Sequence, residues 1–301
     1  MPDPSLERLL SQPVRDAIES AVSAHLGRPW RVATVESRAS QASHPAAVLA
    51  GGGCSVFVKL GQGALARDQF DREAAGLRLL TERSDVLTPA IIGIVPIEGG
   101  AVLIMQAVQI AERQSDHWRQ MGQALARLHG CKWDRFGLDT DCYWGDLYQD
   151  NSPLADWPDF FWQRRLEPRL RAEVDSGHLP TMLAAQVAGL AARMPELCGP
   201  TVAPALLHGD AHLNNFLSTA QGPVLIDPAA YYGHPEVDLA HVDIFAPVND
   251  ELFQAYQETA AIEPGFAERR DLWRLPFWLA MVEVEGARHL DSLAGVLRRY
   301  L

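Results

Sequence analysis

The feature that most constrains the fold of this chain is an alternation of short apolar segments and polar loops over residues 205–228. The first apolar segment leads into a loop that carries Asp210 and, five residues later, Asn215. A second apolar segment follows a Gln-Gly-Pro turn and ends on Asp227. Short strands joined by such a turn pair as a hairpin, so we expect the three polar side chains to meet at one edge of it.

This set of side chains suits one kind of chemistry. Two carboxylates and an amide oxygen are good ligands for a hard cation such as Mg²⁺. Phosphoryl transfer needs such a metal, and it needs a carboxylate that orients the attacking hydroxyl and accepts its proton. The pattern therefore predicts an ATP-dependent kinase with Asp210 as the catalytic base and with Asn215 and Asp227 as Mg²⁺ ligands. Taken singly, each residue would be an ordinary polar group of a loop.

A kinase site makes a further demand upstream, on a strand lysine that holds the phosphates and a helix glutamate that holds the lysine. Lys59, one of only two lysines in the chain, follows the apolar residues 56–58, and Glu73 lies 14 residues further on. The apolar segment 102–106 matches the strand that leads into a kinase hinge, where Met105 and Ala107 would contact the adenine. Without such a site, Lys59 would be a charge on an edge strand, Glu73 a solvated helix residue and the segment 102–106 a plain buried strand.

The spacing of apolar residues predicts an α+β protein of two lobes, with an N-lobe over residues 1–107 and a C-lobe over 108–301. In the N-lobe we expect two helices and an antiparallel sheet with glycine turns. These helices cover 4–26 and 64–83, and the strands cover 30–35, 46–50, 55–60, 91–96 and 101–106. The C-lobe should be mostly helical, with helices over 115–130, 155–173, 181–194, 236–245, 250–261 and 267–299.

The segment 226–240 reads IDPAAYYGHPEVDLA and resembles the DPA-x-YYGHxExDLA run of the fructosamine kinase (ketosamine-3-kinase) family. Residues 136–138 and 157–166 are similar to two further segments of that family, and the order of the motifs spans residues 30 to about 245. The resemblance places the chain within the aminoglycoside-phosphotransferase-like group. It implies a two-lobed protein-kinase-like fold and transfer of the ATP γ-phosphoryl to a hydroxyl of a fructosamine or related ketosamine.

The resemblance also implies roles for residues around the catalytic loop. Asp238 would brace this loop by accepting backbone N–H bonds, although on its own it could equally be a surface helix residue. His208 would orient the same loop. Tyr232 and His234 either line the acceptor pocket or pack against the catalytic loop.

Two departures from the family pattern bear on the substrate and on the nucleotide. His212 stands where the family has a tryptophan beside the substrate, so His212 is a candidate substrate contact. An aminoglycoside, an amino alcohol or a sugar therefore remains an alternative acceptor. Residues 36–44, the loop over the nucleotide, contain no glycine and no cysteine. This loop motivates a third hypothesis, that the protein is a nucleotide-binding pseudokinase that acts as a scaffold. The complete set of site residues argues against this hypothesis.

Composition limits the remaining choices. The formal net charge is −12, which argues against a nucleic-acid or anionic-membrane surface because both require a basic footprint. The four cysteines are scattered, which favours free thiols over a disulfide framework. No signal segment and no apolar run of membrane-spanning length is visible, so we expect a cytoplasmic protein. The expected partner is a small-molecule acceptor, bound by a monomer or a homodimer.

Overall fold

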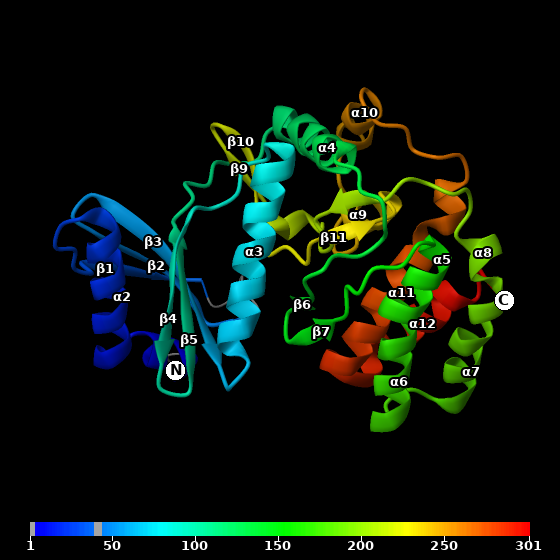
Figure 1. Cartoon of the computed structure of the whole chain (residues 1–301), viewed down its shortest axis with the longest axis horizontal. Helices are drawn as coiled ribbons and strands as arrows, with labels where there is room; N and C mark the ends of the chain where they lie inside the picture. The colour runs from blue at the N-terminus through cyan, green and yellow to red at the C-terminus, as the bar shows by residue number, and fades with distance from the viewer. Residues whose placement is uncertain (1–3, 39–43) are drawn as a thin grey trace.

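The structure is a computed structural model that describes residues 4–38 and 44–301 (Figure 1). Its N-terminal part, on the left of Figure 1, is built on an antiparallel sheet with the strand order β1-β2-β3-β5-β4. The strands are β1 (Thr34–Ser37), β2 (Ala46–Gly51), β3 (Cys54–Gln62), β4 (Ile91–Ile97) and β5 (Gly100–Gln106). The β2–β3 and β4–β5 hairpins turn at glycines with positive φ, Gly52, Gly53 and Gly99.

Helices cover both faces of this sheet. Helices α1 (Pro4–Leu9) and α2 (Gln12–Leu26) pack on the face that carries Val56, Val58 and Ile104. Helix α3 (Ala66–Ser84) packs on the opposite face, against Leu103 and Met105. Successive side chains of a strand point to opposite faces, so Lys59, next to Val58, lies on the α3 face.

The C-terminal part, on the right of Figure 1, is mostly helical and encloses two apolar cores. Its helices are α4 (Ser115–Gly130), α5 (Trp157–Phe160), α6 (Glu167–Ser176), α7 (Thr181–Gly189), α8 (Met194–Leu197), α9 (Glu236–His241), α10 (Glu251–Gln257), α11 (Phe266–Glu285) and α12 (Leu290–Leu297). A π-helical segment, η1 (Phe161–Leu166), joins α5 to α6, and short 3-10 turns are η2 (Ala191–Arg193), η3 (Leu213–Asn215) and η4 (Gly286–His289).

Three small antiparallel hairpins or pairs lie among these helices and position the loops of the site. They are β6 (Cys142–Trp144) with β7 (Leu147–Gln149), β8 (Ala205–Leu207) with β11 (Tyr231–Gly233), and β9 (Phe216–Thr219) with β10 (Gly222–Leu225). The β9–β10 pair is the hairpin that the sequence predicts between Asn215 and Asp227.

The two-lobed α+β architecture agrees with the prediction from the sequence, but several element boundaries differ from it. The predicted helix 4–26 is interrupted at residues 10–11, and the predicted strand 30–35 begins only at Thr34. Trp30 is instead held by its indole N–H, which donates to Gly51 O at 2.8 Å. The predicted helix 267–299 breaks at Gly286, whose φ of 80° ends α11. The β6–β7 hairpin was not predicted.

Other expectations have a more limited outcome. The four cysteines are free, as expected. Within the described part of the chain, no helix is both long and apolar enough to cross a membrane. The lobe boundary after residue 107 stays a prediction; the sheet ends at Gln106 and the first C-terminal helix begins at Ser115. Most of the glycine-free loop, residues 39–43, lies outside the described residues.

Candidate functional site

The loop that carries Asp210 is fixed by a close approach of two backbone segments. Gly209 has a φ of +80°, and a Cβ at this position would lie 2.0 Å from Ala229 O. Only glycine fits such a contact, since any side chain would collide with the backbone. The neighbouring Ala229 N–H donates to His208 O at 2.9 Å. The His-Gly-Asp sequence is therefore matched to the turn that follows β8.

Asp238 holds the same loop from helix α9. Its carboxylate accepts the backbone N–H of His208 at 2.7 Å and of Gly209 at 2.9 Å. It also lies 3.2 Å from His129 Nε2. Burial raises the pKa of Asp238, but the hydrogen bonds and the charge of His129 outweigh this effect, so the net pKa is lowered. The buried carboxylate is therefore ionised at neutral pH.

Asp210 lies beside Asn215, which comes from the η3 turn. The Asn215 side-chain amide donates to Asp210 O at 2.8 Å and to Asp210 Oδ2 at 3.1 Å. His212 Nε2 lies 3.5 Å from the same carboxylate oxygen. Burial raises the pKa of Asp210, and the hydrogen bonds from His212 and Trp144 lower it by more. Asp210 is thus an ionised carboxylate that can accept a proton.

Asp227 follows β10 in an unusual backbone conformation. Its φ of +55° lies in the left-handed region, which a non-glycine residue rarely adopts. Such a conformation costs free energy and persists only where the surrounding structure enforces it. Residues of this kind are often found at functional sites. The backbone N–H of Ile226, just before it, donates to Asn215 O at 3.1 Å. This bond ties the segment that carries Asp227 to the loop that carries Asp210 and Asn215.

The upstream pair predicted from the sequence reaches this point from the N-lobe. Lys59 Nζ lies 2.8 Å from Glu73 Oε1 of α3 and also forms a short ion pair with Asp227. Burial lowers the pKa of Lys59, but the two carboxylates raise it by more. Burial raises the pKa of Glu73 to about 7, against the effect of Lys59. Residues of β3, of α3 and of the segment after β10 are therefore brought into one cluster, in which Lys59 is the most buried side chain.

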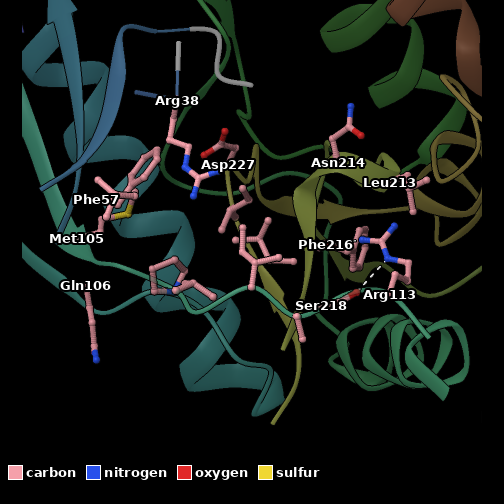
Figure 2. A pocket seen from close by; sticks show the side chains of 17 residues that line it. Arg38, Phe57, Met105, Gln106, Arg113, Leu213, Asn214, Phe216, Ser218 and Asp227 are labelled. Atoms are coloured by element: carbon pink, nitrogen blue, oxygen red, sulfur yellow. Dashed lines mark hydrogen bonds between the residues drawn. The ribbon is translucent and has the colours of Figure 1, made fainter. Parts of the chain in front are cut away.

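Two cavities meet at Asp227. The larger, about 560 Å³, lies between the sheet and the C-lobe, and Figure 2 shows Phe57 and Met105 on its one side and Leu213 and Phe216 on its other. The smaller cavity, about 210 Å³, is more polar and is lined by Asp210, Asn215, His212, Lys59 and Glu73. Asn214, Ile226 and Asp227 line both cavities. The two cavities are therefore adjacent at these three residues.

Three of the residues singled out from the sequence are not placed at the cavity walls. Tyr232 is 2 % exposed and stacks on Trp133, and His234 is 1 % exposed and stacks on Trp273. Neither lines either of the two cavities, so the structure corresponds to the packing alternative for both. The N–H of Ala107 donates to Ser55 O at 3.1 Å and is not available to a ligand.

The structure also adds residues that the sequence reading missed. The β6–β7 hairpin brings Tyr143 and Trp144 to the wall of the smaller cavity. Trp144 stacks on His241 at 5.7 Å between ring centroids. The Tyr143 hydroxyl donates to Asp68 of α3 at 2.9 Å, so the hairpin also connects the two lobes. The sequence signal for this hairpin was weak, since it consisted of the aromatic pair Tyr143-Trp144 before Gly145.

The donor set at the junction fits a magnesium ion that is bound together with a ligand. No cluster of three or more His, Cys, Asp or Glu side chains suited to a metal occurs among residues 4–38 and 44–301. The junction instead offers two carboxylates and one amide, and Mg²⁺ commonly takes one or two carboxylates plus phosphate oxygens and water. Asn215 turns its NH₂ group to Asp210, which leaves its carbonyl oxygen for another partner.

Comparison with known proteins shows a relationship over nearly the whole chain. The family model of fructosamine kinase matches residues 14–301. A probable ketoamine kinase of Synechocystis sp. is 32% identical over 291 residues, which cover 94% of this chain and 96% of that protein. The ketosamine-3-kinase of Mus musculus is 28% identical over 270 residues, which cover 81% of this chain and 87% of that protein.

Solved structures agree with this relationship. A structure from Thermobifida fusca that is assigned as a fructosamine-3-kinase has a TM-score of 0.83 and 29% identity, with 94% of this chain and 98% of that chain covered. An aminoglycoside phosphotransferase solved with ADP and hygromycin B has a TM-score of 0.60 at 15% identity, with 94% and 96% covered. The second likeness shows the fold alone and confirms the expected two-lobed protein-kinase-like fold. With the family model matching from residue 14 to the end of the sequence, the chain belongs to the fructosamine kinase family.

Proposed function

We propose that this protein transfers the γ-phosphoryl group of ATP to a hydroxyl of a ketoamine, that is, a sugar adduct of an amine. The observation that carries the proposal is the junction of two cavities at Asp227, beside the Lys59–Glu73 pair. One cavity is large and partly apolar, as a nucleotide requires. The other contains the ionised carboxylate of Asp210, which an attacking hydroxyl requires. The family membership supports the same reaction.

In this proposal the nucleotide base lies against the N-lobe sheet. Met105, Gln106 and Val108 line the larger cavity at the segment that connects the lobes. Because the amides of Gln106 and Ala107 are bonded to Ala90 O and Ser55 O, the backbone contacts to the adenine are assigned to the Gln106 carbonyl and the Val108 amide instead. The phosphates extend from there towards Lys59, whose cation neutralises part of their charge.

The residues of this chain then divide the reaction between them. Asp210 orients the acceptor hydroxyl and takes its proton as the oxygen attacks the γ-phosphorus, and the bond to the bridging oxygen of ADP breaks. Asn215 holds the Asp210 carboxylate in place through its amide. Asn215 and Asp227 would hold Mg²⁺, which supplies positive charge to the phosphate oxygens when it is bound. Asp238 keeps the loop in the shape that this alignment needs.

The smaller cavity sets the requirements for the acceptor. Its walls combine carboxylates with His212, Tyr143 and Trp144, so they offer hydrogen bonds to several hydroxyls and an aromatic surface. A ketoamine meets these requirements with its sugar hydroxyls and its basic nitrogen. His212 at the cavity wall keeps a second candidate open, a kinase of the same fold for an aminoglycoside, an amino alcohol or a sugar.

The first test is a phosphorylation assay with ATP, Mg²⁺ and a small deoxyfructosyl amine. We expect turnover by the wild-type protein and a fall in kcat of about 10²–10⁴-fold in Asp210→Asn, because general base catalysis contributes about this much. ATP affinity should change little, since Asp210 lies in the other cavity. Full turnover by Asp210→Asn would exclude the base assignment.

A panel of acceptors separates the two candidates. The same ADP-release assay with aminoglycosides, amino alcohols and free sugars should give lower kcat/KM than the deoxyfructosyl amine. A higher kcat/KM for one of these classes would replace the ketoamine by that acceptor. Nucleotide binding without turnover of any acceptor would favour the pseudokinase scaffold and contradict the proposal.

A further inference from the structure

A positively charged residue to which the sequence reading gave no role, Arg38, lines the larger cavity. It follows directly on β1, and its N–H donates to Ala46 O of β2 at 2.8 Å. Figure 2 shows its guanidinium group directed towards the part of the cavity that contains Asp227. The other arginine that lines this cavity, Arg113, lies against the C-lobe, where it donates to Ser218 Oγ at 3.0 Å.

The strand register puts Arg38 and Lys59 in one row across the sheet. Ala46 pairs with Lys59 of β3 on one side and is bonded to Arg38 on its other side. Neighbouring strands lie about 4.8 Å apart, so the Cα atoms of the two cationic residues are separated by roughly 10 Å. Directly paired residues point to the same face of a sheet, so both side chains project from this face, Arg38 into the larger cavity and Lys59 into the smaller one.

The next row on the same face is apolar from β2 to β5 and has Glu36 of β1 at its outer end. Val48 pairs with Phe57, and Phe57 pairs with Met105, and all three side chains line the larger cavity. In the cationic row, the residue between the two charges is Ala46, whose methyl group leaves room between them. The larger cavity is thus apolar where Val48, Phe57 and Met105 line it and charged where Arg38 and Asp227 line it, so a nucleoside polyphosphate would place its base at the first end.

A cation at this position would compensate for the unusual composition of residues 36–44. Glycine-rich phosphate loops work because backbone N–H groups without side chains can approach the phosphate oxygens closely. Residues 36–44 contain no glycine. We propose that Arg38 binds the β- and γ-phosphate oxygens of the nucleotide as a second cation beside Lys59, in place of those backbone contacts. The inference rests on the nucleotide site of the proposed function.

The charges already present leave a role for this residue. Lys59 is engaged by both Glu73 and Asp227, so two carboxylates offset its single charge. Arg38 pairs with Glu36 at 2.8 Å, and the Glu36 side chain is 65% exposed. Such a solvent-screened pair is weak. A guanidinium group also has five N–H donors, so it can bind phosphate oxygens while it keeps other partners, Glu36 among them.

The test compares nucleotides that differ only in their phosphates. Calorimetry on the full chain measures Kd for adenosine, AMP, ADP and ATP with Mg²⁺, in the wild type and in Arg38→Gln. We expect the Kd of ADP and of ATP to rise about tenfold, which equals about 1.4 kcal/mol, and the Kd of adenosine to stay unchanged. Arg38→Lys should recover part of the loss, since it restores the charge but not the planar fork.

Arg67→Gln is the matched control, because it removes the same charge from the same lobe at an exposed pair with Asp71. It should leave all four Kd values unchanged. An equal loss for adenosine in Arg38→Gln would mean that the residue only supports the sheet, and an unchanged Kd for ATP would exclude the contact. None of these measurements uses a ketoamine, so failure of the acceptor assignment would be seen separately, in the phosphorylation assay.

Discussion

His234 illustrates, at the scale of a single residue, how packing decides what a side chain near the site can do. Its ring stacks on Trp273 at 5.1 Å and is almost completely buried. Burial lowers the pKa of His234 to about 3, helped by the charges of Arg269, His129 and Lys132. The folded protein therefore keeps this imidazole neutral across the physiological range.

This neutral histidine makes stability depend on pH. The unfolded chain binds a proton at His234 near pH 6.5, whereas the folded chain does so only near pH 3. The unfolded state thus binds more protons between these values, so the contribution of His234 to stability is complete above pH 6.5 and is lost as the pH falls. Between pH 7 and pH 5.5 we expect the wild type to lose about 1 kcal/mol more than His234→Phe.

Denaturant unfolding at several pH values measures this difference. The comparison is between the pH slopes of the two proteins, so a constant change in stability caused by the phenylalanine does not affect it. His25→Gln removes an exposed histidine and should keep the wild-type slope. Parallel slopes for wild type and His234→Phe would contradict a buried neutral imidazole.

The residues of the site differ in how far the sequence could predict them. Lys59, Asp210 and Asp227 each stand next to an apolar segment, so their spacing in the sequence was enough to predict that they belong to one site. Tyr232 and His234 follow Asp227 closely in the sequence, but Tyr232 lies in β11, which pairs with β8, and His234 packs on Trp273, so both side chains are buried in the core. Arg38 was missed because its position depends on the register between two strands, which the sequence does not state.

At the scale of elements, the C-lobe depends on a close crossing of α4 and α10. Gly122 lies in the middle of α4, and a Cβ there would be 2.0 Å from Leu252 O of α10 and 3.0 Å from Tyr256 N. Both neighbours are backbone atoms of a helix, which cannot move aside independently. The absence of a side chain at this position therefore sets the distance between the two helices.

Gly122→Ala should separate these helices and destabilise the protein. Alanine favours a helix over glycine by about 1 kcal/mol, but crowding in a packed core costs about 1–3 kcal/mol. Because the close contact is with a backbone oxygen, we expect crowding near the upper end of this range and a net loss of about 2 kcal/mol in the free energy of unfolding. Gly130→Ala, at the last residue of the same helix and with no neighbour within 4 Å, should be neutral or slightly stabilising. Thermal unfolding distinguishes the two, and equal Tm values would show that the crossing is not tight.

The elements that the sequence predicted well are those with a sustained period. The apolar stripe of α4 and the paired strands of the N-lobe sheet are long enough to show helical or strand patterning. The β6–β7 hairpin consists of two strands of three residues each, too short to show any alternation. The break at Gly286 was missed because apolar residues continue on both sides of it, so the stripe alone does not reveal where α11 ends.

At the scale of the whole molecule, the larger cavity, which is the proposed nucleotide site, belongs to both lobes. Phe57 and Met105 come from the N-lobe sheet, whereas Leu213 and Phe216 come from the C-lobe. A ligand that contacts both sides stabilises only the folded arrangement of the two lobes together. Such a ligand at 100 times its Kd adds about 2.7 kcal/mol to the stability of the folded state. Mg²⁺ should increase the stabilisation by ATP, because it lowers the Kd of ATP for the protein.

Asp227 is the residue through which this increase should act, since it is the one proposed metal ligand that lines both cavities. In the wild type we predict a larger rise in Tm with ATP and Mg²⁺ than with ATP and a chelator. In Asp227→Ala the two shifts should be equal, because Asn215 alone cannot hold the ion against water. Adenosine, which has no phosphate for the metal, should raise Tm equally in both proteins and so report that the cavity is intact. Asp71→Ala, at an exposed pair on α3, serves as the control that keeps the Mg²⁺ dependence. A persisting Mg²⁺ effect in Asp227→Ala would move the metal site away from the junction of the two cavities.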